Sequence, residues 1–409
     1  PTATITLTHT ITRTFSSTPT ISETWTITET HTITETHTIT ETHTVSPTIT
    51  PSFTATVTPT FTASPTPFWR VVGSAGFSDS EANDLSLFVD QGAVYLCYRD
   101  AAFTDRATLM KYSAAWLPVG PKGFTEGIAY EPSLFVYYGI PYVAFRDYNA
   151  NQNKASVMKK DGLSSWQYID SRGITPGRAY FPSLFVNDLD NFFLGFSDST
   201  VSNRASVYEH NIAGWAYLGP AGISAGSAAY VSNFVDTSTG DKYIAYSDQS
   251  LGGRLYVKKY SAGTWSDVGS PGVSSNASAY VSLYVPPGGA PYVAYMDAAS
   301  QNRATVRRYD GANWVNVGSP GFSSGRAEYI SLAVRGGTVS VAFRDSGLGD
   351  RAVVMRNDGA GWNLFAVVSD AAANYVRLFI DPLSGRPYVA YKDEYQGGRA
   401  TVVMYEGNY

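Results

Sequence analysis

The 409-residue chain has little of what enzymes commonly use for metal binding or nucleophilic catalysis. It contains one cysteine, Cys97, and five histidines, of which only His210 lies beyond His43. One cysteine forms no internal disulfide, and an isolated histidine supplies neither a zinc ligand set nor a Ser-His-Asp or Cys-His arrangement. We therefore predict no catalytic residue, no metal site and no cofactor, and expect that the chain is not an enzyme.

The chain also lacks a basic surface and a long apolar run. The formal net charge is −5, and no cluster of Lys and Arg stands out. Binding to nucleic acid requires cations that neutralise phosphates, so we predict no nucleic-acid partner. No stretch of about 18 apolar residues is present, and we predict no membrane span.

Glycine is missing from the first 72 residues, where a strict two-residue period appears instead. Every even-numbered residue from Thr2 to Thr66, 33 of 33, is Thr or Ser. A two-residue period separates side chains onto opposite sides only when the backbone is extended. Without glycine, Asn-Gly or Asp-Gly we expect no hairpin. Residues 1–67 are therefore predicted to form an extended arm.

The composition of this arm is typical of O-glycosylated extracellular stalks, which are rich in Thr, Ser and Pro. A disordered linker, the alternative, does not require its hydroxyls in one register. The odd positions from Ile27 to His43 repeat Ile, Glu and His, a pattern that would align one arm against another. We predict a secreted or cell-surface protein, self-association through the arm, and covalent O-glycans at Thr24, Thr26, Thr28, Thr30, Thr32, Thr34, Thr36, Thr38, Thr40, Thr42 and Thr44.

From residue 68 the chain repeats every 47 to 51 residues. Each repeat has an aromatic-rich segment ending in Asp, a basic residue six or seven positions later, and a tryptophan. The aspartates, which we expect to pin turns by hydrogen bonds or salt bridges, are Asp100, Asp147, Asp198, Asp248, Asp297, Asp345 and Asp393. Each repeat reads as four short strands with turn residues between them. Seven such units in radial array predict an all-β fold, a seven-bladed β-propeller of four-stranded blades over residues 68–409.

The last repeat lacks its outer strand, and Trp69 to Gly73 match the missing segment. We predict that they pair with the strand around Ala400 to Tyr405 and close the ring within one molecule. Donation of this strand by a neighbouring molecule is the alternative.

The repeats, which read SLxV, PYVAYxD, RATVxKY and WxxVG, resemble those of bacterial secreted β-propeller repeat proteins, which are commonly joined to Thr/Pro-rich tracts. The resemblance covers residues 68–409. It implies the propeller fold and a secreted protein with a Thr/Pro-rich, O-glycosylated stalk, and it says almost nothing about activity. The first repeat departs from the pattern with Asp84 where others have Tyr, and the second has Lys154 in place of Arg.

Tyrosines in the connections between repeats are the best candidates for binding. We expect them on the same face as the turns that carry Asp and Arg. Aromatic rings stack on the apolar faces of sugars, while Asp and Arg hold hydroxyls. We predict glycan sites, repeated on one propeller face, from Tyr130, Tyr180, Tyr230, Tyr280, Tyr329 and Tyr375, with Tyr280, Asp297 and Arg303 forming one representative site. The alternative is that these tyrosines only pack between blades.

Three functions fit these observations. The main prediction is an extracellular structural protein, a glycosylated fibre or stalk subunit with a propeller head. The alternative is a lectin or adhesin that binds glycan ligands through repeated sites. A propeller glycosidase or lyase is the third possibility, since the distances between carboxylates of different blades are open at this stage.

Overall fold

The computed structural model describes residues 68–148, 151–162, 165–189, 191–269 and 272–407, together with the backbone of two earlier strands. The chain divides into two compact units, Pro1–Thr66 and Pro67–Tyr409.

In the first unit, β1 (Thr4–Arg13) and β2 (Trp25–Thr34) pair as an antiparallel two-stranded sheet. The expectation of an arm without a hairpin is therefore wrong for these residues. A long connection can reverse the chain without the glycine that a two-residue turn needs. The register pairs even positions with even positions, such as Thr4 with Thr34, and odd with odd, such as Ile5 with Ile33. Of the predicted glycosylation sites, Thr24 and those from Thr36 to Thr44 lie outside the described residues.

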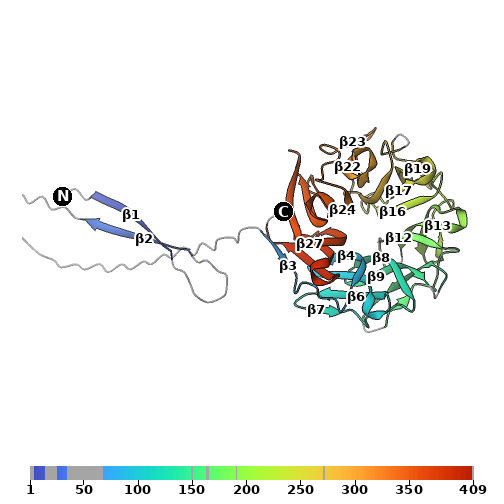
Figure 1. Ribbon diagram of the computed structural model, residues 1–409, viewed down its shortest axis with the longest axis horizontal. Coiled ribbons are helices and arrows are strands. Elements are labelled where there is room, and N and C mark those ends of the chain that lie inside the picture. Colours follow the sequence, from blue (N-terminus) through green and yellow to red (C-terminus); the bar gives the residue numbers. More distant parts are fainter. Residues whose placement is uncertain are drawn as a thin grey trace, which may run out of the picture. The chain divides into compact units, whose positions relative to one another are not determined.

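The second unit is an all-β propeller. Figure 1 shows its sheets around a central axis, with β4, β8, β12, β16 and β24 nearest to it. Five sheets are antiparallel and four-stranded. They are formed by β4 (Ala82–Asp90), β5 (Ala93–Asp100), β6 (Arg106–Tyr112) and β7 (Trp116–Pro118); β8 (Ile128–Tyr137), β9 (Ile140–Tyr148), β10 (Lys154–Lys159) and β11 (Gln167–Tyr168); β12 (Ala179–Val186), β13 (Phe192–Asp198), β14 (Arg204–Asn211) and β15 (Gly214–Tyr217); β16 (Ala228–Val235), β17 (Lys242–Asp248), β18 (Arg254–Ser261) and β19 (Thr264–Asp267); and β20 (Ser278–Tyr284), β21 (Tyr292–Asp297), β22 (Arg303–Tyr309) and β23 (Trp314–Asn316).

The last two repeats share one seven-stranded sheet, so the prediction of seven separate four-stranded blades is wrong. The described residues form five separate four-stranded blades and this larger sheet. In it β27 pairs first with β26 and, from Ala373 onward, with β28. Its strands are β24 (Ala327–Arg335), β25 (Thr338–Asp345), β26 (Arg351–Asn357), β27 (Trp362–Ile380), β28 (Pro387–Asp393), β29 (Arg399–Tyr405) and β3 (Trp69–Val71).

The continuity of β27 has a cause in the sequence. Residues 363–375 contain neither glycine nor proline. The equivalent connection after β15 contains Gly219 and Gly222 at φ 79° and 72°, a conformation that glycine adopts without steric cost. Without such residues the backbone stays extended from the outer strand of one repeat into the inner strand of the next.

In six of the seven repeats, the aspartate that ends the second strand caps the turn after it. In six repeats this turn is a 3₁₀ helix, η1 (Ala101–Phe103), η2 (Ser199–Val201), η3 (Gln249–Leu251), η4 (Ala298–Ser300), η5 (Ser346–Leu348) and η6 (Glu394–Gln396). Asp100, for example, accepts hydrogen bonds from Ala102 N (3.0 Å) and Thr108 Oγ1 (2.7 Å). Within the described residues, no ion pair joins these aspartates to the basic residue six or seven positions later. These six turns are thus pinned by hydrogen bonds, whereas Asp147 of the second repeat forms an ion pair with Arg172.

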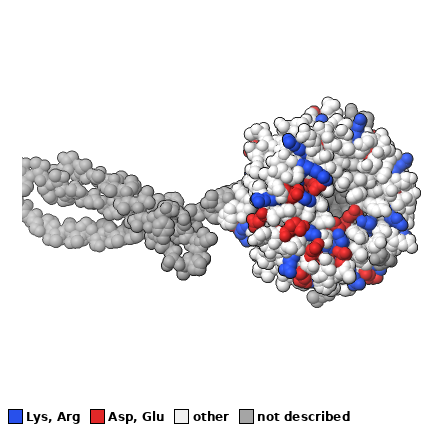
Figure 2. Space-filling model, viewed as in Figure 1, with Lys and Arg blue, Asp and Glu red and all other residues white. Residues whose placement is uncertain are grey.

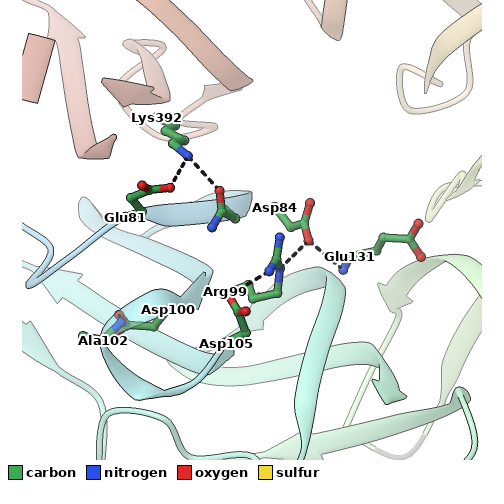
Figure 3. A network of polar contacts seen from close by, with 9 residues as sticks. Glu81, Asp84, Arg99, Asp100, Ala102, Asp105, Glu131 and Lys392 are labelled. Atoms are coloured by element: carbon green, nitrogen blue, oxygen red, sulfur yellow. Dashed lines mark hydrogen bonds and ion pairs between the residues drawn. The ribbon is translucent and has the colours of Figure 1, made fainter. Parts of the chain in front are cut away.

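The ring closes as predicted, because Trp69, Arg70 and Val71 pair with Tyr405, Met404 and Val403. Val72, only 2% exposed, joins a core cluster with side chains of β4, β5, β28 and β29. Lys392 Nζ, on β28 of the last repeat, also donates a hydrogen bond to Glu81 Oε2, just before β4 of the first repeat, at 2.8 Å (Figure 3). Both ends of the propeller sequence therefore contribute to one core.

Candidate functional site

The inner strands present three layers of residues to the propeller axis, because residues two apart in a strand share a face. We call them the mouth layer, the serine layer and the aromatic layer. The mouth layer is Asp84, Glu131, Phe181, Tyr230, Tyr280, Tyr329 and Tyr375; the serine layer is Ser86, Ser133, Ser183, Ser232, Ser282, Ser331 and Arg377; the aromatic layer is Phe88, Phe135, Phe185, Phe234, Tyr284, Ala333 and Phe379.

The first two layers line a cavity of about 340 Å³ on the axis. No residue of the aromatic layer lines it. The six rings of that layer contact one another in sequence, with centroid separations from 4.5 Å between Phe88 and Phe379 to 5.3 Å between Phe185 and Phe234. The cavity is therefore a cup whose walls are the mouth and serine layers.

A β-bulge places each mouth residue. The pairing of β16 with β17, for instance, shifts register between Ala229 and Ser232, and the bulged Tyr230 has φ 53°. All seven mouth residues have φ between 50° and 54°. Such a conformation costs a non-glycine residue about 1 to 3 kcal/mol, and a bulge redirects the side chain it carries. The same strained backbone conformation therefore recurs in all seven repeats, and it directs each of these side chains toward the cup.

Five of the mouth residues form a continuous aromatic arc. The ring centroids are 5.5 Å apart for Phe181 and Tyr230, 5.3 Å for Tyr230 and Tyr280, 5.2 Å for Tyr280 and Tyr329, and 5.0 Å for Tyr329 and Tyr375. Burial raises the pKa of the Tyr280 and Tyr375 hydroxyls to about 12, so both remain protonated at neutral pH. In the described part of the chain, the hydroxyls of Tyr230, Tyr280 and Tyr329 have no hydrogen-bond partner and are available to a ligand.

Two carboxylates, Asp84 and Glu131, complete the circle. Arg99 Nε donates to Asp84 Oδ2 at 3.0 Å, and the backbone N–H of Glu131 points to the same carboxylate (Figure 3). Arg146 Nε lies 3.3 Å from Glu131 Oε2. Burial raises the pKa of the Glu131 carboxyl, and Arg146 opposes that shift. Figure 2 shows charges of both signs gathered near the centre of this face, over β4, β8 and β27.

The serines tie neighbouring inner strands together. Each hydroxyl oxygen accepts a hydrogen bond from a backbone N–H on the next inner strand, at 2.9 to 3.2 Å, and the six donors are Leu134, Leu184, Asn233, Leu283, Leu332 and Leu378. In the seventh repeat Arg377 occupies the serine position. This layer was not predicted from the sequence, although its signal is visible as Ser-Leu or Ser-Asn in six repeats and Arg-Leu in the seventh.

The structure brings together only part of the predicted tyrosine set. Tyr230, Tyr280, Tyr329 and Tyr375 share one cavity, and the structure does not separate them into repeated sites. Tyr130 and Tyr180 are in a different register, one residue before the mouth layer. The Arg146 guanidinium lies 4.5 Å from the ring centroid of Tyr130 and 5.2 Å from that of Tyr180, as in cation–π contacts.

The predicted group of Tyr280, Asp297 and Arg303 is not assembled around the cavity. Asp297 is 5% exposed, and its carboxylate accepts from Ala299 N and Thr305 Oγ1, both at 3.0 Å. Arg303 begins β22, opposite Asp297 in the backbone register. Neither residue lines the cup.

Two further properties bear on function. Within the described residues there is no group of three or more His, Cys, Asp or Glu side chains placed to hold a metal ion. The same residues include no helix with the length and apolar character needed to cross a bilayer.

No protein-family model matches the sequence, and no curated protein matches it. Solved structures do match. The BP39L lectin from Burkholderia pseudomallei is 16% identical with a TM-score of 0.59, and the match covers 81% of this chain and 99% of the lectin. A PL25 polysaccharide lyase, an ulvan lyase, is 12% identical with a TM-score of 0.54, covering 82% and 95%. The polysaccharide lyase Uly1 is 10% identical with a TM-score of 0.51, covering 81% and 91%. At these identities the likeness shows the fold alone.

These neighbours contradict the prediction that the chain is not an enzyme. Two of them are polysaccharide lyases, so a propeller of this fold is compatible with catalysis. The prediction relied on the absence of cysteine and histidine groups, and that absence excludes only the chemistries that need them.

Proposed function

We propose that this propeller is a lectin that binds a glycan in its central cavity. The observation that carries the proposal is the aromatic arc, which presents four tyrosines and one phenylalanine to a single cup. Sugars offer apolar faces to aromatic rings and hydroxyls to polar groups. The cup supplies both, since tyrosine hydroxyls, Asp84 and Glu131 surround the same volume as the rings.

The size of the cup and its neighbours in fold support this choice. About 340 Å³ lies at the lower end of the range for small-ligand pockets, roughly 300 to 1,000 Å³. It therefore suits a short saccharide or the end of a longer one. The lectin and the lyases named above share the fold, which favours the lectin alternative over the structural fibre as the function of the propeller.

Tyr280→Ala and Tyr329→Ala test the proposal. Each removes one ring of the arc, and we expect about a tenfold loss of glycan affinity per ring, from a stacking contribution of roughly 1.4 kcal/mol. The measurement is calorimetric titration with glycans found by array screening. Tyr138→Ala is the matched control, because Tyr138 is 75% exposed and lies outside the cup.

Two results would contradict the lectin proposal. One is the absence of any glycan binding at millimolar concentration, and the other is equal loss of affinity in the control. Cleavage of the bound oligosaccharide to an unsaturated product would instead assign lyase activity to the same cup.

We propose separately that the arm carries O-glycans and that the protein acts outside the cell. The support is the placement of Thr or Ser at all 33 even positions from 2 to 66. Intact and peptide mass spectrometry of native protein is expected to find hexose on most of Thr24 to Thr44 at even positions. If the arm of the native protein is unmodified, the proposal of O-glycosylation is wrong. The segment is then a plain linker, and the support for a fibre is lost.

A further inference from the structure

The serine layer breaks the repeat symmetry at one position. Six repeats place serine there, and the seventh places Arg377 on β27, two residues after Tyr375 of the aromatic arc. Arg377 lines the cup together with the serines. Because a serine at this level ties two inner strands together, arginine in its place lacks a stabilising hydrogen bond that the other six repeats form.

The guanidinium of Arg377 has few partners. Its Nη1 donates to the backbone oxygen of Val376 at 2.9 Å. No carboxylate of the described residues lies within ion-pair distance of it. The nearby acids are already engaged, Asp84 with Arg99 and Glu131 with Arg146. Most of its five N–H donors therefore remain for a ligand.

The electrostatic environment favours an anion beside this group. Burial lowers the pKa of Arg377, and the more distant Asp84 opposes that shift. Arginine nevertheless stays protonated in proteins. Burying a cation without a close counter-charge costs free energy, and an anionic ligand bound beside the cation offsets that cost.

We propose that Arg377 makes the cup select glycans that carry an acidic group, a carboxylate or a sulfate ester. This inference rests on the proposed glycan binding. The planar guanidinium matches both groups with two parallel hydrogen bonds. The acidic group lies in the serine layer, and the sugar ring that carries it stacks on the arc above, near Tyr329 and Tyr375.

A competing role for Arg377 is purely structural, as a distant counter-charge to Asp84. The two roles differ in what a substitution changes. A counter-charge affects the stability of the protein and leaves the preference among ligands unaltered. A recognition residue affects the preference between acidic and neutral ligands.

The experiment titrates the full chain with three matched probes, a glucose oligosaccharide, its counterpart with one uronic acid, and its counterpart with one sulfate ester. Arg377→Ser installs the side chain of the other six repeats. We expect this variant to lose about 10- to 100-fold in affinity for an acidic probe, from the loss of charged hydrogen bonds. Affinity for the neutral probe is expected to stay within about twofold.

Two further variants complete the design. Arg377→Lys keeps the charge and loses the planar fork, so it should retain part of the selectivity. Arg308→Ser removes an exposed arginine of β22 outside the cup and should change nothing. The carboxylate and sulfate probes show which group is preferred, and melting curves confirm that all variants are folded.

The outcomes separate this inference from the proposed function. If no probe binds the unaltered protein, glycan binding itself fails. If glycans bind, Arg377→Ser can still weaken the binding of neutral and acidic probes equally, or weaken the binding of neither. In both cases the lectin proposal stands and the proposal that Arg377 selects acidic glycans is wrong.

Discussion

Deleting residues 1–75 is expected to lower the unfolding free energy of the propeller by roughly 5 kcal/mol or more, because β3 closes the ring. Burial of Trp69 and Val72 contributes about 1.5 to 3 kcal/mol each. The lost hydrogen bonds add about 1 kcal/mol each. They include Val72 N to Val402 O and Trp116 Nε1 to Val72 O, both at 2.8 Å.

Deleting only residues 1–66 is the matched control, since it leaves β3 in place. Chemical denaturation of both truncated chains and of the full chain measures the difference. Equal stability of the two truncated chains would show that β3 does not close the ring. A stability that rises with protein concentration in the full chain would indicate strand exchange between molecules.

Replacing Asp147 with alanine is expected to cost about 3 kcal/mol of unfolding free energy, the cost of removing one partner of a buried ion pair. Asp147 is fully buried. Its carboxylate receives Arg172 Nε at 2.6 Å, Arg172 Nη2 at 3.1 Å and Ser156 Oγ at 3.2 Å. Because the Arg172 side chain is 22% exposed and also forms an ion pair with Glu126, the charge left behind stays partly compensated, and we expect the lower end of the range.

Asp370→Ala is the control for this prediction, because Asp370 is an exposed aspartate of β27 and should change stability by less than about 0.5 kcal/mol. A double variant, Asp147→Ala with Arg172→Met, should recover part of the loss, because it removes a cation that would otherwise keep only the exposed Glu126 as its partner. If Asp147→Ala is as stable as Asp370→Ala, the carboxylate of Asp147 does not stabilise the fold. The recurring position of the aspartates in the repeats would then favour a role in ligand binding.

Most of the fold could be predicted because its information is local. The repeat period, the alternating apolar residues and the turn residues each act over a few positions, and the missing outer strand was recognised from one tryptophan. The number of separate sheets was predicted wrongly, although the glycine-free stretch after Trp362 coincides with the continuous β27. The pairing of β1 with β2 was not predicted, because the glycine and Asn-Gly signals mark only short turns and a longer connection needs neither.

The site was less accessible from the sequence. Tyr130 lies three residues before Ser133, whereas Tyr280 lies two residues before Ser282, and both strands carry the same bulge. Tyr130 therefore aligns with Ala279, and Glu131 takes the position that faces the cup. Which of these two positions faces the cup became visible only in the structure. Asp297 was predicted as a ligand group because its turn was expected on the same face as the tyrosines. Its carboxylate is instead used within its own turn, which only the packed structure reveals.

The sequence by itself determined that this chain is a repeated all-β propeller with its first strand completing its last repeat, since strand patterns and turn residues act locally. Only the tertiary structure decided that aromatic rings from five different repeats meet in one cup. The reason is that each inner strand contributes a single residue to each layer, and these residues, about 50 positions apart in sequence, become neighbours only when the ring closes.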